Sequence, residues 1–135
     1  MPDTFRTRRR VEFADTDMAG MVHFANFFRY MEAAEVEFLN SLGLSVAMRG
    51  QGGERLGLPR VSAACDYQSP ARFEDVLDVV VTVKSVGRTS VTYGFEFFKG
   101  ERLVAKGQIT AVCCRITVDH IESVEIPEEI RRKLL

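Results

Sequence analysis

The chain has 135 residues, 46% of them hydrophobic and 27% charged, with a formal net charge of −1. This composition predicts one folded domain over residues 1–135 and lacks the basic field that nucleic-acid partners require. No apolar run approaches the roughly 18 residues of a membrane span, and the first residues lack the apolar core of a signal peptide. With three cysteines and no C-x-x-C pair, we expect a cytoplasmic protein without a zinc ribbon.

The N-terminal half predicts one strand followed by one long helix. Residues 6–13, RTRRRVEF, favour a strand whose alternate arginines form a solvated face. From Phe24 to Leu42 apolar residues recur every three or four positions, which predicts an amphipathic helix, and Gly43 is a natural stop. The glycine-rich segment 49–57 then predicts a mobile loop.

The C-terminal half changes to a period of two, which predicts antiparallel strands. We expect a last strand that is central and covered on both faces, since it is apolar around 109–116. A short helix follows at 127–135, with proline at its first position. One helix on one antiparallel sheet gives an α+β sandwich with apolar surface left over, which favours a dimer. The predicted strands are 58–68, 75–86, 90–98 and 102–118.

The segment FADTDMAGMVHFANFF, residues 13–28, sets two acids one residue apart before the predicted helix. An aspartate at this place is commonly a helix cap. Asp15, Asp17 and His23 would be cramped as metal ligands, and the other histidine, His120, lies far along the chain. We therefore expect no metal site.

The longer segment VEFADTDMAGMVHFANFFRYMEAAEVEFL, residues 11–39, resembles the hotdog-fold acyl-CoA thioesterases. Its D-T-D-x-x-G-x-V-x-x-x-N-F pattern is similar to the 4-hydroxybenzoyl-CoA thioesterase family, which includes the Tol-Pal-associated thioesterases. The resemblance implies a long helix wrapped by an antiparallel sheet, an acyl-CoA substrate and no cofactor beyond the coenzyme A of that substrate. It also implies a homodimer, able to double to a homotetramer, with active sites at the dimer interface.

The resemblance assigns roles to two positions. The family's catalytic carboxylate falls on Asp17, and the backbone N–H that polarises the thioester carbonyl falls on Phe24 in the first helical turn. Tol-Pal-type members carry a tyrosine-histidine pair where this chain has His23 and Phe24, and an arginine where it has Glu35. These differences favour the wider family.

Thioester hydrolysis requires attack on a carbonyl and stabilisation of the oxyanion. Asp17 could act as general base or as nucleophile, and the free N–H groups of a helix start could hold the oxyanion. Gly20 gives the connecting loop freedom to turn. We expect Asp15 to hold this loop through backbone hydrogen bonds.

Further residues are candidates for substrate binding. Gly20, Val22 and His23 are candidates by their place in the motif, and His23 is expected to line the mouth of the pocket or to be partly exposed. Glu32 could face the acyl pocket across the dimer or form an ion pair with Arg29.

The turn at 87–90 is a candidate for binding coenzyme A. Arg88 could reach a phosphate, while Thr89 and Ser90 begin a strand whose backbone could pair with the pantetheine amides.

Two other functions stay open. A hotdog dehydratase would use a histidine with a carboxylate, and His23 with Asp17 is the available pair. A non-catalytic acyl-CoA sensor would bind the ligand without releasing thiol.

Overall fold

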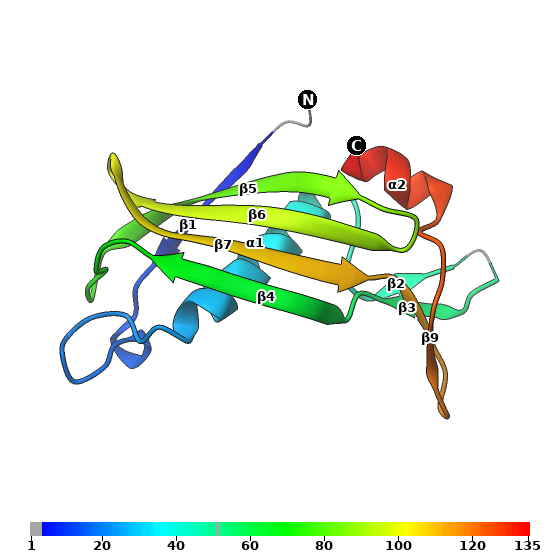
Figure 1. The fold of residues 1–135 in the computed structure, drawn as a ribbon, viewed down its shortest axis with the longest axis horizontal. Coiled ribbons are helices and arrows are strands. Elements are labelled where there is room, and N and C mark those ends of the chain that lie inside the picture. Colours follow the sequence, from blue (N-terminus) through cyan, green and yellow to red (C-terminus); the bar gives the residue numbers. More distant parts are fainter. Residues whose placement is uncertain (1–3, 51) are drawn as a thin grey trace.

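The computed structural model describes residues 4–50 and 52–135. A five-stranded antiparallel sheet has the order β1-β5-β6-β7-β4, and a smaller four-stranded sheet has the order β2-β3-β8-β9 (Figure 1). In chain order the elements are β1 (Phe5–Arg10), the short 3-10 helix η1 (Phe13–Asp15), α1 (Asn26–Ser41), β2 (Met48–Arg49), β3 (Arg55–Gly57), β4 (Arg60–Tyr67), β5 (Val76–Val86), β6 (Ser90–Lys99), β7 (Arg102–Val112), β8 (Cys114–Ile116), β9 (Ile121–Ser123) and α2 (Glu128–Leu134).

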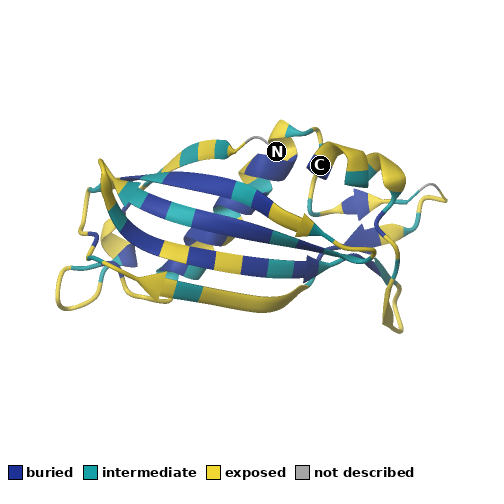
Figure 2. Cartoon of the chain, turned by 45° about the horizontal axis from the view of Figure 1, so that its top comes forward, coloured by how far each residue is buried: buried dark blue, intermediate teal, exposed yellow. Residues whose placement is uncertain are grey.

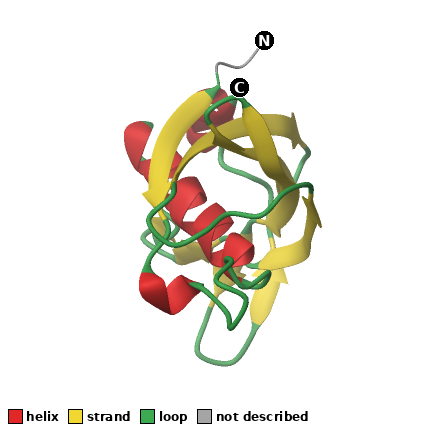
Figure 3. Ribbon diagram, turned by 90° about the vertical axis from the view of Figure 1, so that its left-hand side faces the viewer, coloured by secondary structure: helices red, strands yellow, loops and turns green. Residues whose placement is uncertain are grey.

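The large sheet curls around one side of α1, as the end-on view shows (Figure 3). The apolar stripe of α1 packs on the alternate, mostly β-branched and aromatic residues that β5 and β6 point inward. The helix and the sheet approach each other closely at Gly107 of β7, where an added Cβ would lie 2.4 Å from the sulfur of Met31 in α1. This arrangement confirms the predicted α+β class and the hotdog architecture.

The first strand and the helix begin or end at other residues than predicted. The first strand ends at Arg10 rather than 13, because the chain turns into η1 at Phe13–Asp15. The helix begins at Asn26, so the prediction that Phe24 lies in its first turn was wrong. Apolar periodicity continued through Phe24, but that residue belongs to the turn closed by the hydrogen bond from Asn26 N–H to the His23 carbonyl (2.9 Å).

The later strands also needed two corrections. The segment 49–57 is not all loop, since β2 and β3 form a short hairpin there. The predicted strand 102–118 breaks between β7 and β8, and β7 is next to the edge of its sheet rather than central. Lys106 and Gln108 are exposed on its outer face, whereas none of residues 109–116 is exposed. The predicted coverage of both faces therefore holds from Ile109 onward and not for the first part of β7.

Strand β4 forms an edge of the large sheet and is exposed along nearly its whole length, in contrast to β5, β6 and β7 (Figure 2). Even the apolar residue Val61 of this strand is 62% exposed. Its partner on one side is β7, and its other side pairs with no strand in the described part of the chain. A long strand with one free edge is a ready surface for pairing with another strand.

Of the helices in residues 4–50 and 52–135, none is both long and apolar enough to cross a membrane.

Candidate active site

The two acids lie in a compact loop between η1 and α1. Residues Thr16 and Val22 form an isolated antiparallel bridge, and Asp17 N–H donates to the Met21 carbonyl at 2.8 Å. Gly20 closes the turn with a φ of 79°, donating its N–H to the Asp17 carbonyl. A left-handed φ is costly for residues with a side chain, so the sequence folds into this turn because glycine stands there.

Asp17 lies at the exposed tip of this loop. Its Oδ1 accepts hydrogen bonds from the N–H groups of Ala19 (2.9 Å) and Met21 (3.4 Å). Within the described residues, Oδ2 has no hydrogen-bond partner. The side chain borders an open hollow of about 650 Å³ that Phe13 and Phe73 also line. One carboxylate oxygen is therefore fixed by the loop while the other faces open space.

Asp15 is 6% exposed and does hold the loop, as expected. Its Oδ2 accepts hydrogen bonds from the Glu12 N–H (2.9 Å) and the Tyr30 hydroxyl (2.8 Å). Its main-chain carbonyl accepts from the His23 N–H (2.9 Å) and the Asn26 side-chain amide (2.8 Å). Asp15 thus links both flanks of the loop to the start of α1.

Phe24 follows His23 and directly precedes the N-cap Ala25. Its N–H has no hydrogen-bond partner among the residues that the structure describes. Its ring stacks on His23, with ring centres 4.8 Å apart. The Ala25 N–H is directed to His23 Nδ1 at 3.3 Å. Phe24 therefore lies outside the helix, in the turn that leads into it.

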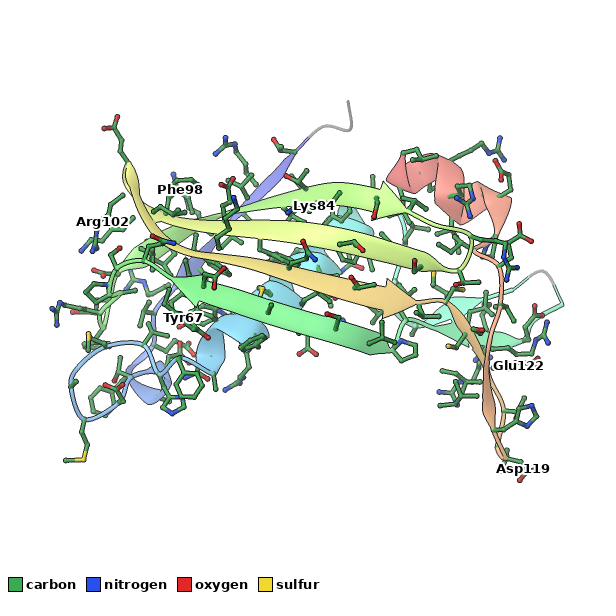
Figure 4. The ribbon with its side chains drawn as sticks, in the orientation of Figure 1. Tyr67, Lys84, Phe98, Arg102, Asp119 and Glu122 are labelled. Carbon is green, nitrogen blue, oxygen red and sulfur yellow. The ribbon has the colours of Figure 1, made fainter. Side chains whose placement is uncertain are left out.

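An aromatic cavity of about 330 Å³ lies beside Phe24. Phe27 and Tyr67 line it together with Val22, which is 7% exposed. The Tyr67 hydroxyl donates to the Phe24 carbonyl at 3.0 Å, and Tyr67 lies at the end of β4 beside the loop (Figure 4). Sequence reasoning missed Tyr67, since no local pattern shows that β4 ends next to the helix start.

Glu32 is exposed on α1, and the alternative ion pair with Arg29 is not formed among the described residues. The neighbouring Glu35 is 0% exposed and accepts a hydrogen bond from the Arg60 guanidinium. Burial raises the pKa of Glu35, although Arg60 opposes that change. Its Oε2 and the nearby Tyr93 hydroxyl have no hydrogen-bond partner within the described residues.

Arg88, Thr89 and Ser90 lie at the other end of the molecule in one chain. The Asp17 loop begins beside the start of β5, where Arg10 pairs with Val76, whereas the turn follows the end of that 11-residue strand. At about 3.3 Å per residue the two ends are roughly 35 Å apart. The structure therefore groups Asp17, Gly20, Val22, His23 and Phe24 but does not bring this turn to them within one chain.

The turn is itself firmly held. The Arg88 carbonyl accepts from the Ile126 N–H (2.9 Å) and from Arg131 (3.1 Å), and the Thr89 carbonyl accepts from the Cys113 N–H (2.7 Å). The exposed Arg88 side chain is in no hydrogen bond or ion pair with the described residues. It is a free cation on a fixed turn.

No group of three or more histidine, cysteine, aspartate or glutamate residues suited to a metal ion occurs in the described part of the chain.

Comparisons with known proteins agree with this fold. Residues 11–134 match the model of the Thioesterase-like superfamily, and the chain belongs to this family. The crystal structure of a hypothetical protein from Aquifex aeolicus has a TM-score of 0.87 and 33% identity, covering 97% of this chain and 99% of that one. The structure of a 1,4-dihydroxy-2-naphthoyl-CoA thioesterase from Synechocystis has a TM-score of 0.84 and 28% identity, covering 98% and 96%.

A third relative, named acyl-CoA thioester hydrolase YbgC, comes from Escherichia coli O6:H1. It is 27% identical over 110 residues, which are 81% of each chain.

Proposed function

We propose that the protein hydrolyses acyl-CoA thioesters to a free acid and coenzyme A. The observation that supports this proposal most is the pairing of two groups in one short loop. Within residues 4–50 and 52–135, one carboxylate oxygen of Asp17 and the backbone N–H of Phe24 have no hydrogen-bond partner. Membership of the Thioesterase-like superfamily and the names of two relatives support the same reaction.

In the proposed reaction the thioester carbonyl oxygen binds the Phe24 N–H. Negative charge develops on that oxygen as the carbonyl is attacked. The hydrogen bond from the Phe24 N–H is therefore stronger in the transition state than in the ground state. Asp17 either removes a proton from the attacking water, which gives the free acid directly, or attacks the carbonyl itself. The C–S bond then breaks, and the thiolate of coenzyme A leaves and takes up a proton. In the second route Asp17 and the acyl group form a mixed anhydride, and a water molecule then hydrolyses it to the free acid and the restored carboxylate. These residues require no metal or redox cofactor for this chemistry.

The acyl group is proposed to occupy the aromatic cavity beside Phe24. That cavity of about 330 Å³ is lined by Phe24, Phe27 and Tyr67, which offer apolar surface and ring faces to a planar or aliphatic chain. His23 stacks on Phe24 at the outer side and would meet the thioester end. Gly20 and Val22 shape the loop between the two catalytic groups.

A homodimer paired through β4 would complete the site. β4 has a free edge and ends at Tyr67, at the Asp17 end of the molecule. Antiparallel pairing of two β4 strands about a two-fold axis reverses the second chain, so its Arg88 turn would lie at the Asp17 end of the first. The proposed dimer therefore reconciles Asp17 as catalytic residue with Arg88, Thr89 and Ser90 as coenzyme A contacts, and places Glu32 near the interface.

The test is thiol release from a panel of benzoyl-CoA, hexanoyl-CoA and palmitoyl-CoA. We expect turnover with at least one member, and a rate lower by on the order of a hundredfold or more in Asp17→Asn. Binding of all three without thiol release would contradict hydrolysis and favour the sensor. Hydration of crotonyl-CoA without thiol release would favour the dehydratase.

A further inference from the structure

Beneath the Asp17 loop, side chains from three elements lie in contact: the buried Asp15 and Tyr30 and the half-buried Arg9. Tyr30 of α1 is 2% exposed and donates its hydroxyl to Asp15 Oδ2 at 2.8 Å. Arg9 of β1 places its guanidinium carbon 5.3 Å from the centre of the Tyr30 ring. Burial, followed by the hydrogen bond to Asp15, raises the pKa of Tyr30 above its ordinary value of 10.0. The hydroxyl thus stays protonated and remains a donor across neutral pH.

Asp15, which accepts that hydrogen bond, contacts both flanks of the loop. Asp15 stands two residues before Asp17, and its carbonyl accepts the N–H of His23, the residue before Phe24. The loop tip between these points, residues 17–20, is exposed. Hydrogen bonds within the loop, such as that from the Asp17 N–H to the Met21 carbonyl, shape its tip, while the Asp15 side chain ties the loop to Tyr30 of α1.

We propose that Tyr30 is a positioning residue for the proposed hydrolysis: acting through Asp15, its hydroxyl fixes the Asp17 carboxylate relative to the Phe24 N–H. The proposal rests on the function proposed above. The hydroxyl makes no hydrogen bond in the described part of the chain except the one to Asp15. The ring has a separate role, packing edge-on against Phe27 at 5.7 Å.

This division makes Tyr30→Phe a clean perturbation, since it removes the hydroxyl and keeps the ring. A small displacement of a catalytic group is costly to rate because reacting atoms must be aligned. We expect kcat for benzoyl-CoA, or for hexanoyl-CoA if only aliphatic substrates turn over, to fall by about tenfold. KM should change by less than about twofold, because substrate contacts are retained.

Tyr93→Phe is the matched control. Tyr93 is also fully buried, but its hydroxyl has no hydrogen-bond partner among the described residues. We expect wild-type kcat and KM from this variant. An equal loss of kcat in both variants would overturn the proposal, because it would report a general effect of removing a buried hydroxyl.

A second variant covers the case in which Tyr30→Phe does not fold. Asn26→Ala removes the side-chain donor to the Asp15 carbonyl (2.8 Å) and should likewise lower kcat with little change in KM. Circular dichroism and the melting temperature report the folded fraction of each variant. Unchanged kcat in a folded Asn26→Ala protein would overturn the proposal if Tyr30→Phe is unfolded.

The double variant Asp17→Asn with Tyr30→Phe separates positioning from a general structural effect. If Tyr30 acts through Asp17, it should add less than about a threefold loss to that of Asp17→Asn, since residues acting as a unit are not additive. A full multiplicative loss would overturn the proposal. Near wild-type activity in Asp17→Asn would instead refute the proposed function, whereas an inactive Asp17→Asn with a fully active Tyr30→Phe would refute the positioning role alone.

Discussion

Asp17→Asn is the substitution that most directly tests the proposed chemistry. Both backbone hydrogen bonds to the side chain reach Oδ1, from Ala19 and Met21, and an asparagine oxygen at that place keeps both. Because the side chain is also exposed, we expect the free energy of unfolding to change by less than about 0.5 kcal/mol. The loop should therefore survive the change.

The rate of hydrolysis should fall strongly in Asp17→Asn. An amide can neither accept the proton of an attacking water nor attack the carbonyl, so kcat should fall on the order of a hundredfold to ten-thousandfold. This is roughly 2.7–5.4 kcal/mol of transition-state stabilisation. Coenzyme A should bind as it does to the wild type. The assay is thiol release, paired with thermal unfolding of the same preparation.

Asp15→Asn should give the opposite balance. Asp15 Oδ2 accepts two hydrogen bonds in a buried place, so the substitution should cost about 1–3 kcal/mol of stability. Its loss of rate should be smaller than that of Asp17→Asn, within about a hundredfold. If Asp15→Asn were the inactive protein and Asp17→Asn remained active, the assignment of the catalytic acid would be refuted.

Three other predictions concern the rest of the molecule. Arg88→Ala should raise KM for acyl-CoA by roughly two- to tenfold, leave kcat unchanged and weaken the salt dependence of KM; a fall in kcat alone would contradict a phosphate contact. The raised pKa of Glu35 means that the folded protein holds a proton there above pH 4.5, the ordinary value, so its contribution to stability is full below that pH and is lost as pH rises through the folded pKa. Urea unfolding across this range should show that slope in the wild type and lose it in Glu35→Gln; an unchanged slope would contradict burial of an ionisable Glu35. Sedimentation should show a dimer at micromolar concentration, and a stable, active monomer would contradict the proposed assembly.

Much of the fold could be predicted because its signals are local. The apolar stripe of α1 and the alternation in β5 and β6 report which face of each element is buried, and both appear in neighbouring residues. Ends of elements are harder, as Phe24 shows: its aromatic side chain continues the helical pattern, while hydrogen bonds around His23 start the helix two residues later.

The site could be predicted only where it is continuous in sequence. Asp17, Gly20 and Phe24 belong to one loop, so the motif contained them. Tyr67 is distant in sequence and reaches Phe24 only because β4 and α1 meet in space. The position of the Arg88 turn could not be deduced for the same reason, since periodicity gives the face of a strand and not which end of another element it approaches.

The hydrogen bond from Tyr67 to the Phe24 carbonyl has a consequence for how activity depends on protein concentration. Tyr67 ends β4, whose outer edge pairs with no strand in the described residues, and the Phe24 carbonyl that accepts its hydrogen bond lies in the peptide unit joining Phe24 to the N-cap Ala25. We therefore expect a shift of β4 on pairing with a second chain to move Phe24, the residue proposed to bind the oxyanion. Dilution below the dissociation constant of the proposed dimer should then lower turnover per chain while each chain keeps its secondary structure, which makes assembly itself a control on catalysis.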